Sequence, residues 1–303
     1  MSIEIIKDFE KHLIVVDLDG TVLKKDFATL SEIDKETLQE VQERGNKVVI
    51  ATGRNYLSAL PFYKEIGLDT FLITYNGAHI DHPLKRHSPI MAILPLANVT
   101  VRKILNEEII RNNLLNVLID SVDKETISTG EDIYYQEVFF NGNTYHATND
   151  ALQHLGDRDC LQLVLEFKND KKLVDSIHSV LGENYKTSVN YYSGKKLKAE
   201  KEGNKILVPD PEKVIFKIRS SKADKYEAVA KLAAYYNIDK SRIIAFGNDV
   251  NDIDMIKKVG RGVAMTNGND DLKPYARSIT RLDNDKGGVA EYLANYFRLR
   301  PRS

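Results

Sequence analysis

The stretch His12-Leu-Ile-Val-Val-Asp17-Leu-Asp19-Gly-Thr21 decides the fold of this 303-residue chain. Residues 12–16 are a short apolar, β-branched run that ends at Asp17, as a buried parallel strand does. Open α/β sheets bind ligands at the carboxyl ends of their strands, so both aspartates stand where a ligand would bind. A simple turn also uses Asp and Gly. However, two carboxylates in one loop repel each other unless a cation relieves them, and Mg²⁺ prefers such oxygen ligands.

Strand-like and helix-like segments alternate on both sides of this stretch and return after Ile218. Apolar Ile33, Leu38 and Val41 predict the buried face of a helix that begins near Ser31 and stops at Gly45. A second helix closes at Gly67. Further strands are expected at 47–51, 71–75 and 242–246, and a further helix at 224–236.

The middle of the chain is longer and less regular. Helical periodicity near 99–111 and 170–181 flanks strand-like runs at 116–120 and 161–165, which is typical of a separate α+β module. Alternation outside it predicts a doubly wound parallel, Rossmann-like sheet. We therefore expect an α/β catalytic core of residues 1–83 and 214–303, interrupted by an inserted α+β domain of residues 84–213.

Composition excludes several classes of protein. Lys and Arg number 43 against 44 for Asp and Glu, so there is no basic excess to bind nucleic acid. The single cysteine, Cys160, excludes an intramolecular disulfide and an all-cysteine metal site. No apolar run is long enough to cross a bilayer, and residues 1–10 lack the apolar region of a signal peptide. A cytoplasmic protein without nucleic-acid or membrane partners is expected.

Polar, glycine-containing segments also follow the other expected strands. Each is ambiguous alone, because Thr-Gly is a common helix entry and clustered Asp and Asn residues form turns and helix caps. Together they favour one shared cleft for an oxyanion and a cation. The segments are Ala51-Thr52-Gly53-Arg54, Tyr75-Asn76-Gly77 and Gly247-Asn248-Asp249-Val250-Asn251-Asp252. Lys222 and Lys225 open the preceding helix, where most lysines are solvated.

With these motifs in order, the whole chain resembles the haloacid dehalogenase-like (HAD) phosphatase superfamily. More narrowly, it resembles the Cof-type hydrolases, which carry a large α+β (C2) cap domain. The motifs above carry the resemblance, and the C-terminal part adds Gly262-Val-Ala-Met265, Asn267 and Gly287-Gly-Val-Ala290. The family lysine stands seven residues before Leu-Ala and twenty-two before the glycine of the acidic motif. Lys225 meets both spacings and Lys222 meets neither.

The resemblance implies a mechanism and a set of site residues. Asp17 would be the nucleophile that forms an aspartyl-phosphate, and Asp19 the general acid and base. The remaining implied residues hold the phosphate or Mg²⁺. The implied phosphate-binding residues are Thr52, Gly53, Arg54, Asn76, Lys225 and Asn251, with Thr52 and Lys225 also counted as catalytic. The implied metal ligands are Asp17, the Asp19 carbonyl, Asn248 and Asp252. The family usually has Asp at position 248, so Asp249 is an alternative ligand if the loop shifts.

The expected function is a Mg²⁺-dependent phosphatase acting on small organic phosphate monoesters, such as sugar phosphates or phosphorylated cofactors. A phosphomutase on the same core is one alternative. The other is a phosphate-ligand binding or regulatory protein in which Asn248 weakens catalysis. A nicotinamide-dependent oxidoreductase is set aside because no Gly-x-Gly-x-x-Gly follows the first strand. The expected assembly is a monomer or weak homo-oligomer. A solvated surface is favoured over substrate contact for Tyr191, Tyr192, Lys195 and Lys196.

Overall fold

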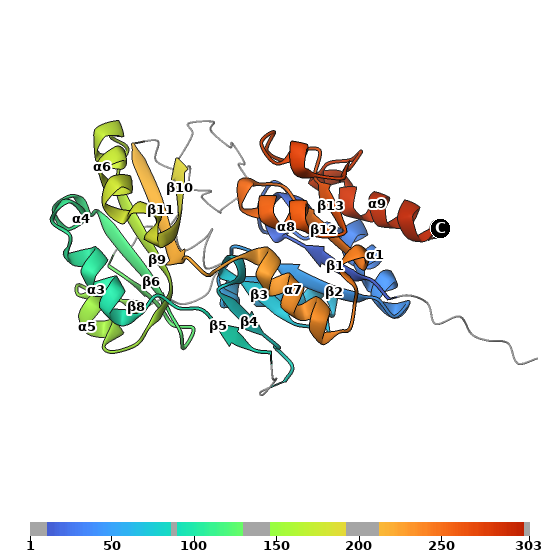
Figure 1. Cartoon of the computed structure of the whole chain (residues 1–303), viewed down its shortest axis with the longest axis horizontal. Helices are drawn as coiled ribbons and strands as arrows, with labels where there is room; N and C mark the ends of the chain where they lie inside the picture. The colour runs from blue at the N-terminus through green and yellow to red at the C-terminus, as the bar shows by residue number, and fades with distance from the viewer. Residues whose placement is uncertain (1–10, 86–89, 130–145, 192–211, 300–303) are drawn as a thin grey trace, which may run out of the picture. The chain divides into compact units, whose positions relative to one another are not determined.

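The computed structural model describes residues 11–85, 90–129, 146–191 and 212–299, and these fall into two compact units (Figure 1). The first comprises Met1–Gly53, Leu60–Met91 and Lys225–Ser303, and the second Arg54–Ala59 and Ala92–Asp224. This division differs at its edges from the expected insertion of residues 84–213. The reason at the C-terminal edge is strand β11 (Lys213–Ser220), which pairs with β9 and so extends the second unit past residue 214.

The strands of the first unit belong to an eight-stranded sheet in the order β14-β13-β12-β1-β2-β3-β4-β5, of which only β5 is assigned to the second unit. All pairs from β14 to β3 are parallel, whereas β4 runs antiparallel to β3. A parallel α/β core is therefore confirmed. The strands are β1 (Leu13–Val16), β2 (Lys47–Ala51), β3 (Leu72–Thr74), β4 (His79–Asp81), β5 (Ala92–Ile93), β12 (Ile243–Gly247), β13 (Arg261–Ala264) and β14 (Ser278–Ile279).

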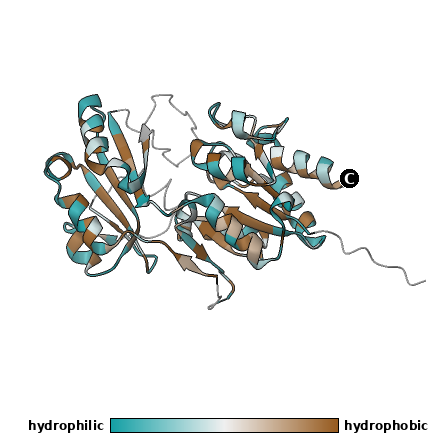
Figure 2. Cartoon of the chain, in the orientation of Figure 1, coloured by the Kyte–Doolittle hydropathy of each residue, from teal (hydrophilic) through white to brown (hydrophobic). Residues whose placement is uncertain are grey.

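Helices cover this sheet in two groups. Helix α1 packs against α9 and β2, and α7 packs against α8 and β3. The central strands β1 and β12 are fully buried and apolar, which Figure 2 shows as continuous hydrophobic colour. The helices are α1 (Glu32–Glu43), α2 (Tyr56–Ile66), α7 (Lys225–Tyr235), α8 (Ile253–Lys258) and α9 (Gly288–Phe297).

Helix α1 buries a different stripe from the one expected. Leu38 and Val41 are buried as expected, but Ile33 is 56% exposed and Asp34 is buried in its place. Asp34 lies one turn before Leu38, on the face that meets α9, and its Oδ1 accepts a hydrogen bond of 2.7 Å from the backbone N–H of Ala290. The carboxylate thus satisfies a free amide in the first turn of α9, which explains a buried charge in an apolar stripe.

The second unit is a six-stranded mixed sheet in the order β10-β11-β9-β6-β7-β8. Among the described strands of this sheet, only β7 and β8 pair in parallel. Apolar side chains of the sheet and its helices form one buried cluster. The remaining strands are β6 (Asn116–Ser121), β7 (Thr126–Ser128), β8 (His146–Ala147), β9 (Cys160–Lys168) and β10 (Tyr185–Tyr191). The helices are α3 (Asn98–Asn106), α4 (Glu108–Asn113), α5 (Ala151–Leu155) and α6 (Lys171–Leu181).

The second unit also buries polar groups. Asp120 on β6 is 2% exposed and accepts a hydrogen bond of 2.7 Å from the Thr126 hydroxyl. Burial raises the pKa of Asp120 to about 7, well above the usual value of a carboxyl group. Tyr192, Lys195 and Lys196 lie outside the described residues, and Tyr191 ends β10. Among the described residues no helix combines the length and apolar character that a membrane span requires.

Candidate active site

Asp17 lies at the carboxyl end of β1, in the middle of the first unit's sheet. Its backbone N–H donates to the Phe246 carbonyl on β12 at 3.2 Å, which continues the strand pairing one residue further. The residue as a whole is only 4% exposed. Asp19 follows two residues later and is partly buried. The two aspartates therefore occupy the strand end where the sequence places them.

The Lys225 ammonium joins two of the predicted carboxylates. Lys225 is the first residue of α7 and is buried, whereas Lys222 is exposed. Its Nζ donates to Asp17 Oδ1 at 3.0 Å and to Asp252 Oδ1 at 2.7 Å. These residues are separated by up to 235 positions in the sequence (252 − 17), yet they form one buried charge cluster.

The electrostatics of this cluster leave it with unbalanced negative charge. Burial is the main cause that raises the pKa of Asp17 to about 7; Lys225 lowers it, and Asp252 and Asp19 add to the rise. Burial alone would lower the Lys225 pKa, but the two carboxylates reverse this and raise it, so the lysine is a cation. Two carboxylates thus share one ammonium, and a third, Asp19, acts on Asp17 from two residues away. A divalent cation would relieve the repulsion.

Asn248 lies against the loop that carries Asp17 and Asp19. Gly20 has a φ of +69°, and a Cβ added there would lie 2.3 Å from Asn248 Nδ2. The Thr21 hydroxyl and Asn248 Oδ1 are 3.5 Å apart. The absence of a side chain at Gly20 therefore admits the Asn248 amide. The Asn248 side chain therefore lies against the loop between Asp19 and Thr21, with its amide nitrogen nearest Gly20 and its Oδ1 near the Thr21 hydroxyl.

The acidic segment after β12 is also a helix start. Asp249 is exposed, and its carboxylate accepts from the Val250 N–H at 2.8 Å and from the Asn269 amide at 3.2 Å. Asp252 Oδ2 accepts from the N–H groups of Asn248 at 3.0 Å and Asp249 at 3.2 Å. Asp249 therefore caps this turn, as the alternative interpretation of the segment as a helix cap expects. Asp252 both caps this turn and binds Lys225.

The loops after β2 and β3 meet the same segment. The Asn76 backbone N–H donates to the Thr52 carbonyl at 2.9 Å, and Asn76 has a φ of +53°. Asn251 Nδ2 donates to Asn76 Oδ1 at 2.9 Å. A Cβ on Gly53 would lie 3.2 Å from the Asn76 amide. Thr52, Gly53, Asn76 and Asn251 are therefore adjacent, while Arg54 is buried and is the first residue assigned to the second unit.

One supporting residue was not predicted as part of the site. Asn267 Nδ2 donates to the Gly20 carbonyl at 2.9 Å, and its Oδ1 accepts from the Asn284 N–H at 3.1 Å. It thereby supports the loop between Asp19 and Thr21. The sequence feature that could have identified Asn267 was its position shortly after β13, at the end of another parallel strand.

The donor set fits a magnesium ion. The second carboxylate oxygen of Asp17, the Asp19 carbonyl and the Asn248 amide oxygen are all hard oxygen ligands. Asp252 is a weaker candidate because both of its oxygens accept hydrogen bonds from protein groups. No sulfur or imidazole ligand belongs to the predicted set, which favours Mg²⁺ over zinc or copper.

Comparison with known proteins gives consistent matches over nearly the full chain. A family model for haloacid dehalogenase-like hydrolase matches residues 14–293. The chain is 32% identical to the 5-amino-6-(5-phospho-D-ribitylamino)uracil phosphatase YitU of Bacillus subtilis, covering 95% of this chain and 98% of the relative. It is 27% identical to phosphatase YwpJ of the same organism, covering 93% and 98%. A crystal structure of a haloacid dehalogenase-like hydrolase from Bacteroides thetaiotaomicron superposes with a TM-score of 0.75 at 26% identity, covering 95% and 100%.

Proposed function

This chain belongs to the haloacid dehalogenase-like hydrolases, among the Cof-type phosphatases, and we propose that it hydrolyses small organic phosphate monoesters through a phosphorylated Asp17. Its class, a phosphoric monoester hydrolase, follows from its family and relatives. The observation that carries the finer proposal is the buried Lys225 ammonium held between Asp17 and Asp252 at the carboxyl end of the parallel sheet.

In the proposed first step, an Asp17 carboxylate oxygen attacks phosphorus and the bond to the ester oxygen breaks. Asp19 gives its proton to the departing alkoxide, so the alcohol leaves neutral. In the second step Asp19 takes a proton from water, and the resulting hydroxide attacks the acyl phosphate. Inorganic phosphate leaves and the Asp17 carboxylate is restored. The partial exposure of Asp19 supports its exchange of protons with water.

Lys225, Thr52 and Asn251 are proposed to hold the phosphate oxygens. The ammonium contacts an Asp17 oxygen at 3.0 Å, so it lies beside the position where the phosphoryl group would bond. Asn251 is fixed by Asn76. Such preorganised donors stabilise the developing charge without reorganising during the reaction. Gly53 and Asn76 complete the phosphate-binding set that we propose for the first unit.

We assign Mg²⁺ binding to Asp17, the Asp19 carbonyl and Asn248, with Asp252 behind them as the partner of Lys225. When bound, the ion supplies charge neutralisation between the carboxylate and the phosphate. Asn248 is preferred over Asp249 because Gly20 leaves room for its amide, whereas the Asp249 carboxylate caps a helix. The name of the 32% identical relative makes the phosphorylated ribitylaminouracil the first natural substrate to assay.

The test is turnover of para-nitrophenyl phosphate with Mg²⁺, with and without a chelator, by the wild type and by Asp17→Asn. We expect phosphate release that both the chelator and the substitution abolish. Rapid-quench labelling with a phosphate-labelled substrate should place the label on Asp17. Turnover that survives both changes, or a label absent from Asp17 while product accumulates, would refute the mechanism. Transfer of the label to a second sugar hydroxyl in place of water would identify a phosphomutase.

A further inference from the structure

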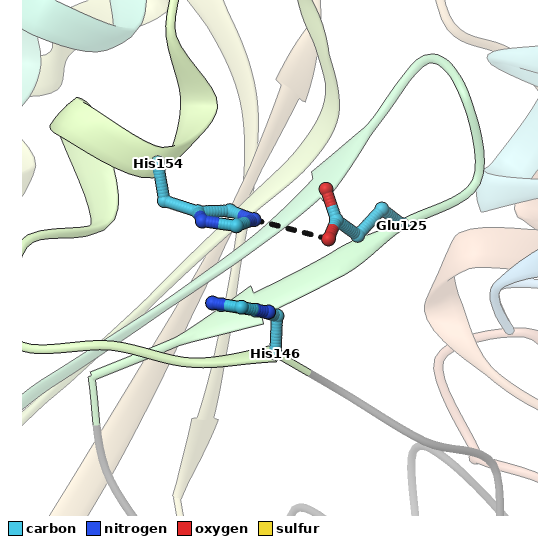
Figure 3. Close-up of side chains that lie close together, drawn as sticks. All are labelled: Glu125, His146 and His154. Atoms are coloured by element: carbon cyan, nitrogen blue, oxygen red, sulfur yellow. Dashed lines mark hydrogen bonds and ion pairs between the residues drawn. The ribbon is translucent and has the colours of Figure 1, made fainter.

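A second group of side chains of the types that can bind a metal ion lies wholly within the second unit. Glu125, His146 and His154 each offer one ligand atom, and these three atoms lie within 4.8 Å of one another. Figure 3 shows the two imidazole rings facing each other with the carboxylate beside them. None of the three belongs to the proposed active site.

Three separate elements bring these residues together. Glu125 lies in the turn between β6 and β7, which the Ser121 N–H closes by donating to the Glu125 carbonyl at 2.9 Å. His146 opens β8, where it is opposite Ile127 of β7. His154 lies on α5, which begins with Asp150 as its helix cap. The cluster therefore depends on the folded sheet and not on a local sequence motif.

The side chains are already oriented toward one another. His154 Nε2 lies 3.0 Å from Glu125 Oε1, where the ring must donate because a carboxylate only accepts. The rings of His146 and His154 stack with centroids 3.6 Å apart and an interplanar angle of 16°. The two rings and the carboxylate are therefore gathered around one small volume, within reach of a single ion.

Arg158 holds the carboxylate in position. Its Nη1 donates to Glu125 Oε2 and, at 2.9 Å, to Asp123 Oδ2. The same guanidinium donates to the carbonyls of His154 at 2.6 Å and Leu155 at 2.9 Å. The second carboxylate oxygen, Oε1, stays directed at His154. Supporting partners of this kind fix the orientation of metal ligands in known sites.

We propose that Glu125, His146 and His154 form a binding site for a divalent transition-metal ion, with Zn²⁺ as the best match. Two imidazole nitrogens and one carboxylate oxygen suit zinc and exclude Mg²⁺ as the preferred ion. Zinc–ligand bonds of about 2.0–2.2 Å require ligand atoms closer together than 4.8 Å. His146 makes this adjustment because it is exposed on a two-residue strand and rotates off the stacked ring. Coordination through His154 Nε2 moves its proton to Nδ1, and solvent fills the fourth position.

Bound zinc would join β8 and α5 to the β6–β7 turn, so the site is structural for the second unit and independent of phosphate chemistry. Untagged full-length protein, freed of metal, is titrated with Zn²⁺ by calorimetry in excess Mg²⁺, which occupies the proposed active site. One equivalent of Zn²⁺ should bind and raise the thermal unfolding midpoint. His146→Gln and His154→Gln should each weaken this binding at least about tenfold.

His178→Gln is the matched control, because His178 is an exposed histidine on α6 of the same unit and lies outside the cluster. It should bind Zn²⁺ as the wild type does. Circular dichroism checks that all three variants fold. X-ray absorption spectroscopy at the zinc edge, on the complex with one equivalent of Zn²⁺, should show nitrogen and oxygen ligands only. Absence of measurable Zn²⁺ binding, or binding unchanged in both His146→Gln and His154→Gln, overturns the proposal. Neither result bears on turnover by Asp17.

Discussion

Replacing Gly20 with alanine should damage catalysis far more than folding. The substitution has two unfavourable effects, one on the backbone and one on a neighbouring side chain, and each can be assessed from the structure. The first is backbone strain, because φ is +69° and an L-residue in the left-handed region costs about 1–2 kcal/mol. The second is contact, because the new Cβ would lie 2.3 Å from Asn248 Nδ2, against the 3.4 Å at which ordinary contact begins. The amide must therefore retreat by 3.4 − 2.3 = 1.1 Å.

Gly67→Ala is the matched control. Gly67 has a φ of +75°, and no atom lies within 4 Å of its added Cβ, so it carries the strain without the contact. Both variants should lose a few degrees in the thermal unfolding midpoint. Displacing Asn248, a proposed metal ligand, by about 1 Å should lower kcat/KM of Gly20→Ala by about 10²-fold. Gly67→Ala should retain the wild-type value.

The assay is para-nitrophenyl phosphate turnover across a Mg²⁺ titration, alongside thermal unfolding of each variant. Gly20→Ala should also require more Mg²⁺ for half-maximal activity, because Asn248 is a proposed ligand. A Gly20→Ala enzyme with the kcat/KM and Mg²⁺ dependence of Gly67→Ala would refute the placement of Asn248 at the metal. Equal loss of activity in both variants would show that strain alone is responsible.

Three further predictions follow from buried charges and the metal site. Lys225→Met should lower kcat by about 10²–10³-fold and destabilise the fold by about 3–5 kcal/mol, because it leaves two buried carboxylates unpaired. The control variant, Lys222→Met, should match the wild type in steady-state assays and in urea unfolding. Asn248→Asp should lower the Mg²⁺ concentration for half-maximal activity about tenfold, and an unchanged titration would move the ligand role to Asp249. Asp120 has a folded-state pKa of about 7, above its ordinary 3.8, so the folded protein retains a proton that the unfolded chain releases. The Asp120 contribution to stability should fall by up to about 4 kcal/mol as pH rises from about 4 to about 7. Asp120→Asn should therefore reduce the pH slope in urea unfolding and leave the part that comes from Asp17 and Asp34, whose pKa values are also raised to about 7.

The strand-end motifs made much of the first unit predictable. Asp17, Thr52, Asn76 and Asn248 each follow a short apolar run, and parallel strands bring such ends to one edge of a sheet. The order of strands along the chain therefore gave the neighbourhood of the site. It did not give the Lys225 contacts, because spacing alone does not say that an ammonium is buried between two carboxylates.

Other features depend on tertiary contacts that leave little trace in the sequence. The sequence places Asp34 in the first turn of a helix. In the structure it is buried, because its side chain accepts a hydrogen bond from the Ala290 N–H of α9. β11 resembles the strands of the core, yet it pairs with β9 and extends the second unit. Glu125, His146 and His154 have no metal-binding spacing and come together only through β7 pairing with β8 and the position of α5.

Asp252 shows that a folding role and a reactive role can share one side chain. One of its oxygens receives the Lys225 ammonium, while the other receives two backbone amides at the start of the 3₁₀ turn Val250–Asp252. A neutral replacement there alters the charge around Asp17 and also removes the oxygen that accepts from the backbone N–H groups of Asn248 and Asp249. An inactive variant at this position would therefore carry little diagnostic value, whereas position 248 permits a clean dissection of chemistry from stability.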